Sequence, residues 1–368
     1  MREFLPDHHG VAIVVLFLLG SAMIFGLGGR AHNDLWLAHL LGIVLAMPMV
    51  SLYARFRSIL PKENLYVGLD TLFGTRVSRL LAFLYAFSAW RLGCLVAKDV
   101  ATFVDIVALD FTPQPVFMLF LAILALWATK EGLETLGRWS VVALKAILFA
   151  GVLTLLLLTT TVDPQQFLPV LYNGWMPVLT GSLELLDFPF LEIAFLIWAF
   201  EALSSKTSPY KILIPGFIIA ALALAATSSM AMAVIGPDKY ESSYFPVYLA
   251  VSRISLFRFL TRLEATVGVI FVLTCFLKVA VCLMVTCKGF AHALGFTDYR
   301  FLVTPFALGL IPGSQWFAKN QMEIHMSATK VVAPYEILIY VILPFVFWIS
   351  AEIKMFRRSK KSKGTSGP

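Results

Sequence analysis

Charged residues are scarce in this chain. Only 14% of its 368 residues are Asp, Glu, Lys or Arg, and 59% are hydrophobic, whereas roughly a quarter of the residues in soluble domains are charged. The mean hydropathy is +0.84, and apolar blocks recur along the whole length, which excludes a separate soluble catalytic domain. The composition therefore predicts a polytopic membrane protein with a single membrane domain.

Disulfide, metal-binding and catalytic patterns are also lacking. The four cysteines lie in apolar helical stretches, so we expect no disulfide framework. The six histidines are scattered without metal-ligand spacing, and nothing resembles a nucleophile elbow, a phosphate loop or a metalloprotease helix. We therefore expect no enzyme activity, no metal and no cofactor. The net charge of +7 indicates basic cytoplasmic loops rather than a nucleic-acid partner.

The apolar blocks predict an all-α protein with about ten membrane spans. A helix needs about 20 apolar residues to cross roughly 30 Å of hydrocarbon. No cleavable signal peptide is evident, so the first apolar block is interpreted as a span. Residues 1–355 form the transmembrane domain in this interpretation, and residues 356–368 form a basic cytoplasmic tail. The expected spans are 11–28, 34–54, 80–109, 115–129, 140–161, 178–203, 210–235, 263–290, 301–318 and 332–353.

Positive charge sets the expected orientation, because cytoplasmic loops carry an excess of Lys and Arg. With the N-terminus inside, most of the 29 Lys and Arg residues fall in cytoplasmic segments. Both termini are then cytoplasmic. The connection 237–262 carries most of the external positive charge, and we expect its residues 245–260 to form an amphipathic helix on the outer membrane interface.

Two of the expected spans contain helix-breaking residues. Gly20-Ser21 lies in the first span and Asp187-Phe188-Pro189 lies in the sixth, and glycine and proline both weaken a helix. Spans one and six begin the two halves of a ten-span chain. Broken helices at matching positions predict a 5+5 inverted repeat with a binding site near mid-membrane. The alternative is that glycine and proline are simply frequent in membrane helices.

Charged residues at membrane depth are costly and need a partner or a wet cavity. Arg91, Lys98 and Asp105 lie seven residues apart on one face of the third span. The sixth span carries acidic residues, which suggests pairing between the two helices around a polar cavity, although fixed ion pairs that only set helix register would give the same pattern. These acidic residues are Glu184, Asp187, Glu192 and Glu201.

Two further lysines lie within spans. Lys145 is close to the start of the fifth span, so its long stem is expected to reach the interface. Lys278 in the eighth span is roughly 15 Å from either end at 1.5 Å per residue. We expect Lys278 to be buried and to act as an internal cation.

Several stretches resemble the B subunit of the spore germinant receptors, which are spore germination permeases of the amino acid/polyamine/organocation superfamily. The resemblance extends from about residue 8 to 355 and is most specific over the block 245–300. The matching stretches are Gly10-Val-Ala-Ile-Val, Leu19-Gly20-Ser21, Phe167-Leu-Pro-Val-Leu, Gly174-Trp-Met-Pro-Val-Leu, 188–192, Phe245-Pro-Val-Tyr, Phe259-Leu-Thr-Arg-Leu-Glu264 and Gly295-Phe-Thr-Asp-Tyr.

This resemblance implies a LeuT-like fold of ten helices in the spore inner membrane or the cell membrane. It also implies that the chain senses a small nutrient such as an amino acid, in a complex with an A-type membrane subunit and a C-type lipoprotein. Carried over by position, the ligand pocket comprises Gly20, Ser21, Ala22, Phe190, Leu191 and Glu192.

The chain departs from the family at two of these positions. The family usually has glycine where Ala22 and Phe190 stand, and the added bulk is expected to reshape the pocket and restrict a transport path. Fold alone does not settle function, so a proton- or ion-coupled amino acid permease is the alternative, and a structural membrane scaffold is a third class. Lys145 and Lys278 argue against sodium dependence, because a lysine can replace a coupling cation.

Overall fold

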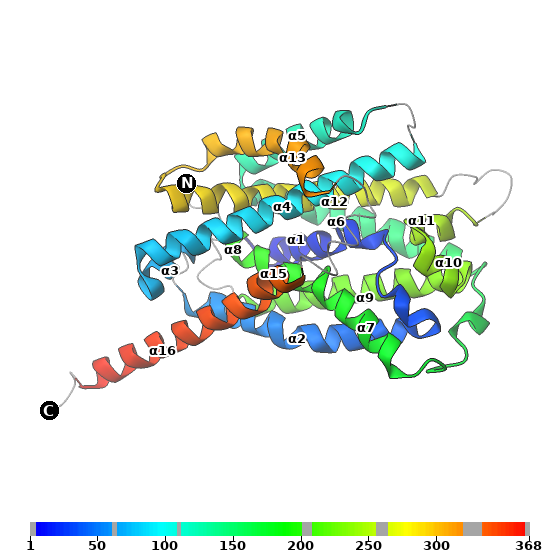
Figure 1. Ribbon diagram of the computed structural model, residues 1–368, viewed down its shortest axis with the longest axis horizontal. Coiled ribbons are helices and arrows are strands. Elements are labelled where there is room, and N and C mark those ends of the chain that lie inside the picture. Colours follow the sequence, from blue (N-terminus) through cyan, green and yellow to red (C-terminus); the bar gives the residue numbers. More distant parts are fainter. Residues whose placement is uncertain are drawn as a thin grey trace.

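The computed structural model describes residues 5–60, 65–108, 112–200, 208–254, 264–318 and 333–364. Within these ranges every regular element is a helix, and the helices form one elongated bundle (Figure 1). The long helices are α2 (Leu35–Ile59), α4 (Thr75–Val107), α5 (Gln114–Glu131), α6 (Leu133–Leu158), α9 (Tyr210–Ile235), α12 (Glu264–Leu294), α13 (Arg300–Phe317) and α16 (Leu343–Gly364).

Shorter helical segments begin, interrupt or connect the long ones. The short elements are α1 (Asp7–Leu19), η1 (Ser21–Met23), η2 (Gly29–Asp34), α3 (Leu65–Phe73), η3 (Pro164–Phe167), α7 (Trp175–Asp187), η4 (Phe190–Phe195), α8 (Leu196–Ala199), α10 (Pro237–Ser242), α11 (Pro246–Val251), α15 (Ala333–Ile337) and the π-helical turn η6 (Leu338–Ile342).

The described helices confirm a multi-pass membrane protein. Seven of them are long and apolar enough to cross a membrane, and the exact count of ten spans stays a prediction. The C-terminal end of α16 and helix α3 lie at one end of the bundle, and α10 and α11 lie at the other (Figure 1). Of the expected interfacial helix 245–260, only Pro246–Val251 is helical, as α11; residues 252–254 are described and leave the helix, and residues 255–260 lie outside the described residues.

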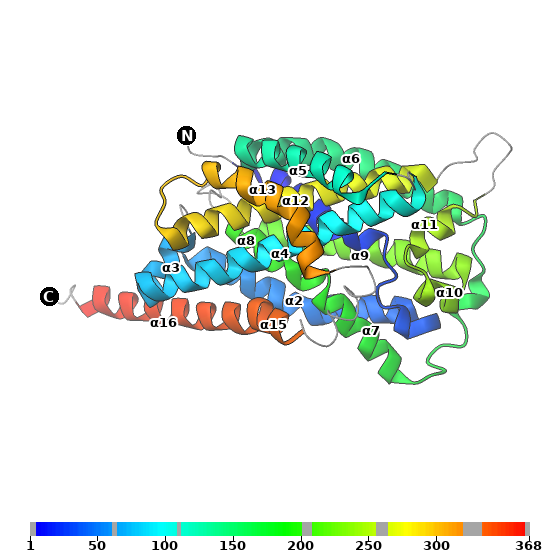
Figure 2. The ribbon, with the colours of Figure 1, turned by 45° about the horizontal axis from the view of Figure 1, so that its top comes forward.

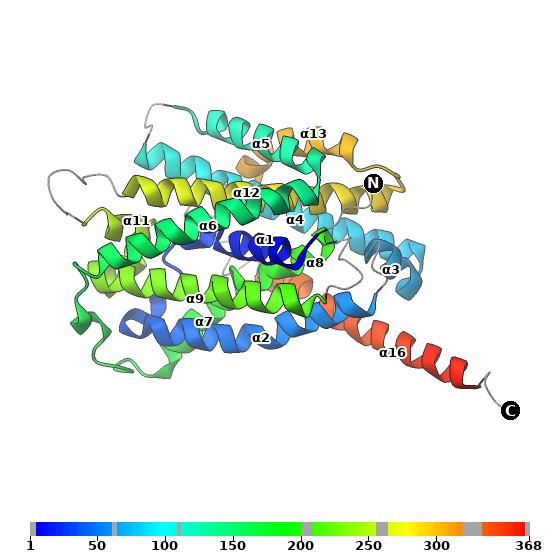
Figure 3. The same ribbon diagram turned by 180° about the vertical axis from the view of Figure 1, so that it is seen from behind.

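Helices α12 and α1 are buried at the centre of the bundle, whereas α6 belongs to an outer, lipid-facing layer. In an apolar stretch of 18 residues, 78% of α12 is buried, whereas only 11% of the equivalent stretch of α6 is buried. Helix α1 is apolar on all sides and is enclosed by α6, α9 and α12 (Figure 3). A helix that is hydrophobic all round belongs in the interior. Large exposed side chains such as Val142 and Phe149 on α6 instead face outward, as contact with lipid requires.

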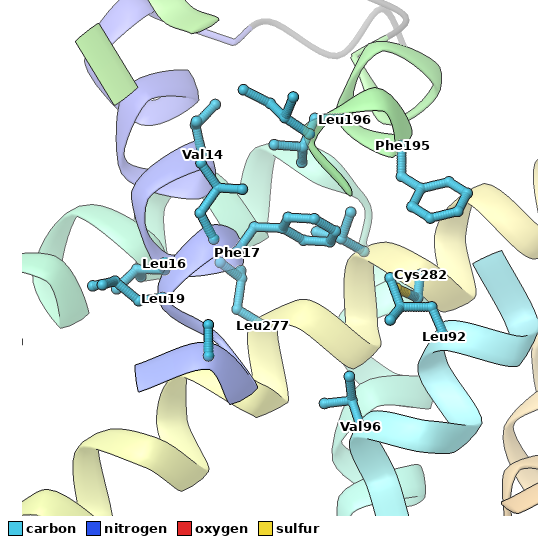
Figure 4. Packing of buried hydrophobic residues seen from close by; sticks show 14 of the residues in the cluster. Val14, Leu16, Phe17, Leu19, Leu92, Val96, Phe195, Leu196, Leu277 and Cys282 are labelled. Atoms are coloured by element: carbon cyan, nitrogen blue, oxygen red, sulfur yellow. The ribbon is translucent and has the colours of Figure 1, made fainter. Parts of the chain in front are cut away.

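The other helices cover this centre from two sides. Helices α5, α6 and α13 lie on one side of the bundle, and α2 and α16 lie on the other (Figure 2). Between them, α12 packs along α4. Figure 4 shows Phe17 of α1, Leu277 of α12 and Leu196 of α8 meeting in one apolar core.

Both breaks expected from the sequence are present, in the first and sixth spans. Helix α1 ends at Leu19, and the chain continues through Gly20 into the 3-10 turn η1. Helix α7 ends at Asp187, and Phe188 is extended with φ −130° and ψ 121°, which is the conformation that a following proline favours. Pro189 then leads into η4. The fold is therefore all-helical with broken first and sixth spans, as predicted.

Candidate functional site

The break in the first span brings the backbone of Gly20 against α12. A Cβ atom at Gly20 would lie 2.5 Å from Cδ of Lys278 and 2.8 Å from the carbonyl oxygen of Phe17. The hydroxyl of Thr274, one turn before Lys278, lies 3.2 Å from the carbonyl oxygen of Gly20. The position therefore requires glycine, because the space of a side chain is occupied by α12.

Lys278 forms a buried ion pair with Glu192. Its Nζ atom lies 2.5 Å from Oε2 of Glu192, and the two side chains are 0% and 4% exposed. The same Nζ atom lies 4.7 Å from the ring centroid of Phe188 and 5.5 Å from that of Phe17, distances at which an aromatic face attracts a cation. One ammonium group thus contacts the first span, the break in the sixth span and η4.

A second polar cluster lies on the other side of the sixth-span break. Asp187, the last residue of α7, lies next to Glu336 of α15. Glu336 also forms an ion pair with Arg91 of α4, whose guanidinium lies 5.9 Å from the ring centroid of Tyr335. The hydroxyl of Tyr335 is hydrogen-bonded to that of Ser88. Two carboxyl groups therefore lie beside the break in the sixth span, with the guanidinium of Arg91 paired to one of them.

Some polar atoms at these breaks have no hydrogen-bond partner among the described residues. The hydroxyl of Ser21, the first residue of η1, is one of them, and Nε of Arg91 is another. Ser21 is 0% exposed. Buried polar groups are nearly always hydrogen-bonded, so the hydroxyl of Ser21 is a candidate contact for a polar ligand group.

The six residues that the family resemblance assigns to the pocket are all buried. Gly20 and Glu192 are brought together through Lys278, and α1 contacts η4. Phe190 packs with its ring 5.2 Å from that of Phe217 on α9. The assignment of Gly20, Ser21, Ala22, Phe190, Leu191 and Glu192 to a ligand pocket remains a prediction.

The charges expected within spans differ in their surroundings. Lys98 is buried and bonds to the side-chain oxygens of Gln114 at 3.0 Å and Gln315 at 3.3 Å, and Gln114 in turn bonds to Asp105. Lys145 is exposed on α6. The direct ion-pair partner of Arg91 is Glu336 rather than an acidic residue of the sixth span, and Glu201 lies outside the described residues.

Sequence reasoning missed Glu336, Tyr335 and Thr274. Glu336 lies near the start of an apolar span, two residues before the first residue of the π-helical turn η6, and π-helical turns are frequent at functional sites. A carboxylate inside an apolar run is the sequence signal that indicates Glu336. Thr274 carries no such signal, because threonine is an ordinary residue in membrane helices.

Comparison with solved structures defines the fold class. Mhp1, a nucleobase-cation-symport-1 family transporter in a closed conformation with bromovinylhydantoin bound, superposes with a TM-score of 0.67 over 92% of this chain and 78% of that chain at 13% identity. MhsT in complex with L-phenylalanine superposes with a TM-score of 0.57 over 95% of this chain and 89% of that chain at 13% identity. The protein is a LeuT-fold membrane protein.

Comparison of sequences defines the family. A family model described as spore germination protein matches residues 5–322, and the chain belongs to this family. Spore germination protein KB of Bacillus subtilis (strain 168) is 27% identical over 360 residues, which cover 96% of this chain and 95% of that relative. The family resemblance seen in the sequence is thereby confirmed.

Proposed function

We propose that this protein is the nutrient-sensing membrane subunit of a spore germinant receptor. In this proposal, a small nutrient such as an amino acid binds between the broken segments of the first and sixth spans. Binding changes the conformation of the chain, and an A-type membrane subunit and a C-type lipoprotein receive the change in the spore inner membrane. The unpartnered, buried hydroxyl of Ser21 beside the break carries this proposal.

The chemistry of the two breaks supports a small polar ligand. Unwound backbone leaves N–H and C=O groups without helical partners, and these groups bind the charged ends of an amino acid. Two LeuT-fold neighbours were solved with a small organic molecule bound, L-phenylalanine in MhsT and bromovinylhydantoin in Mhp1. In the proposal, the two helix breaks of this chain also bind a small polar organic molecule.

The ion pair between Lys278 and Glu192 supplies a route for the conformational change. It joins α12 to η4, and the stem of Lys278 packs against Gly20. A ligand that displaces either side chain therefore alters contacts of both broken spans with α12. A shift from 1:99 to 99:1 between two states needs about 5.5 kcal/mol of differential binding, and contacts with the partner subunits contribute to that difference.

A proton-coupled permease is the second candidate function. The observation that favours it is the proximity of the carboxyl groups of Asp187 and Glu336 next to the break in the sixth span, because carboxyl groups inside membrane bundles serve as proton relays in transporters. In that case Lys278 takes the place of a coupling cation.

The test of the sensing function is Ser21→Ala in spores that carry the variant in place of the wild-type chain. Loss of one net hydrogen bond of about 0.5–1.5 kcal/mol raises the half-maximal nutrient concentration roughly 2- to 12-fold. Germination is followed by loss of optical density with a panel of amino acids, at equal protein levels.

The matched control is Ser140→Ala. Its hydroxyl is also buried but donates to Leu136 within its own helix, so the response is expected to stay unchanged. An unaltered dose response in Ser21→Ala would remove the hydroxyl from the ligand site.

A further inference from the structure

A cavity of about 240 Å³ lies between α7 and α10, both of which contact η2. Helix α10 is at the end of the bundle opposite α3 and the end of α16 (Figure 1). The cavity is distinct from the buried ion pairs and is formed by the chain after η1, by α7 and by the end of α10 with the residues that follow. The lining residues are Gly26, Gly29, Arg30, Glu184, Glu241, Ser242, Ser243 and Tyr244.

The wall of this cavity carries both signs of charge. Arg30 supplies a guanidinium, and Glu184 and Glu241 supply two carboxylates. No ion pair among the described residues joins Arg30 to either carboxylate, although Glu241 lies 3.6 Å from the ring of His32. Glu184 is half-buried and accepts a hydrogen bond from the backbone of Gly28. One guanidinium and two carboxylates thus line the cavity, and the backbone of Gly28 restrains the carboxylate of Glu184.

Size and charge together define the class of ligand. Pockets for drug-sized molecules have volumes of roughly 300–1,000 Å³, so a cavity of about 240 Å³ suits a smaller molecule. A guanidinium binds a carboxylate through two parallel hydrogen bonds, and carboxylates bind an ammonium group. A free amino acid carries both groups on one carbon atom. Ser242 and Ser243 line the same wall, but their hydroxyls donate to the backbone carbonyl oxygens of Asp238 and Lys239.

The position of the cavity relates it to the broken spans. Glu184 lies one helical turn before Asp187 at the end of α7, and Gly26 lies three residues after the end of η1. The same two chain segments therefore form the breaks deep in the bundle and the cavity nearer its end.

We propose that this cavity is an outer binding site for a free zwitterionic amino acid, with the carboxylate on Arg30 and the ammonium on Glu184 and Glu241. The inference rests on the proposed function, since it gives the nutrient a first site before the site at the breaks. The ligand would then contact residues 26–30 and Glu184 before it reaches the buried ion pair of Lys278 and Glu192.

Cysteine labelling tests this site directly. The four native cysteines are buried, so Ser242→Cys in the purified full chain introduces an accessible thiol in the cavity wall. The probes are glycine, L-valine and L-phenylalanine, with phenethylamine and 3-phenylpropionate as molecules that carry only one of the two charges. We expect at least one amino acid to slow labelling by a maleimide about tenfold at saturation, and neither single-charge molecule to do so at the same concentration.

A matched thiol controls for general effects. Ser252→Cys is exposed at the end of α11 and does not line the cavity, and its labelling is expected to be unaffected by any probe. Absence of protection by all three amino acids, or equal protection by the single-charge molecules, would overturn the proposal.

Charge-removing variants separate this site from the one at the breaks. In the Ser242→Cys background, Glu184→Gln and Arg30→Gln are expected to abolish protection, while labelling of Ser252→Cys in the same variants reports an intact fold. The double variant Lys278→Met/Glu192→Gln, which leaves no member of the buried pair alone, is expected to abolish the germination response and leave protection intact. Protection that survives Glu184→Gln and Arg30→Gln but is lost in this double variant would assign the effect to the inner site and refute the outer one.

Discussion

Lys278 places a positive charge where water does not reach. Its side chain is fully buried, and its one ion-pair partner among the described residues is Glu192. Burying two charges costs several kcal/mol per ion, and their attraction offsets this only with good geometry. Such a pair contributes little net stability, but either member left alone is strongly destabilising. The pair therefore fixes the position of η4 relative to α12.

Lys278→Met tests the role of this pair. Leaving Glu192 as an unpaired buried carboxylate is expected to destabilise the protein by about 3–5 kcal/mol, and to disturb signalling. Lys278→Arg is expected to preserve part of both, because the charge remains. Thermal unfolding of the purified protein in one detergent, together with germination of variant spores, measures the effect.

The double variant Lys278→Met/Glu192→Gln is the control for the pair. It removes both charges and is expected to be more stable than Lys278→Met alone. If Lys278→Met unfolds at the wild-type temperature and supports a normal response, Lys278 is a bystander.

The burial of Lys278 was predictable, but the partner of Arg91 was not. The distance of Lys278 from either end of its span follows from residue counting along one helix. Which carboxylate Arg91 meets depends on how three helices pack together, and a sequence pattern reports only the spacing within each helix. Glu336 therefore took the place that the acidic residues of the sixth span were expected to fill.

At the scale of elements, the break at Gly20 is expected to be essential for the response. In Gly20→Leu the new side chain displaces the stem of Lys278, whose Cδ atom lies 2.5 Å from the position of a Cβ, so the contact between the first span and α12 is lost. We expect the nutrient response to disappear at an unchanged protein level.

Spore germination assays and immunoblots measure this, with Gly151→Leu on the outer face of α6 as the control, because nothing lies within 4 Å of a Cβ there. A normal dose response in Gly20→Leu would exclude a ligand site at this break.

The contact between α1 and α9 depends on another close approach. A Cβ atom at Gly216 would lie 2.6 Å from Cβ of Val14, and small residues allow membrane helices to pack closely. Gly216→Ala is therefore expected to destabilise the protein by about 1–3 kcal/mol through overpacking. The change is measured as a lowered thermal unfolding midpoint.

Gly151→Ala provides the comparison. It places the same methyl group in open space on α6 and is expected to be neutral or to stabilise by up to about 1 kcal/mol through helix propensity. Equal midpoints for the two variants would show that α1 and α9 can separate without cost.

Sequence patterns located the interrupted elements well. Gly20 and Pro189 break their helices for local reasons, a missing Cβ and a missing N–H, so their effect is readable from the chain itself. The π-helical turn η6 was not predicted, because its residues Leu338–Ile342 are apolar residues of the kinds found throughout membrane helices and give no local signal. Its geometry depends on the surrounding packing.

For the molecule as a whole, we expect signalling without net transport. A sensor needs only a difference in ligand affinity between two conformations, whereas a transporter must also open to both sides. Purified protein in liposomes should bind an amino acid saturably but accumulate no label, with or without a proton gradient. Gradient-driven uptake by the isolated chain would favour the permease, with Asp187 and Glu336 as its proton site.

The class of the molecule could be predicted from its composition, but the outer cavity could not. Scarce charge and recurring apolar blocks specify a membrane bundle through hydrophobic burial alone. Arg30, Glu184 and Glu241 belong to three separate segments, and their convergence depends on how the ends of these segments fold over one another. The orientation inferred from Lys and Arg remains a prediction.

The depth of the Lys278–Glu192 pair has a consequence for ionic strength. Dissolved salt screens exposed charges over a Debye length of about 8–10 Å at physiological concentrations, and buried pairs far less. The side chains of this pair are 0% and 4% exposed, so the strength of the ion pair is expected to change little between low and high ionic strength. Arg30 and Glu241 are exposed, so the outer cavity is screened. If the protein has the proposed function, an effect of salinity on amino acid binding would therefore arise at the cavity rather than at the Lys278–Glu192 pair.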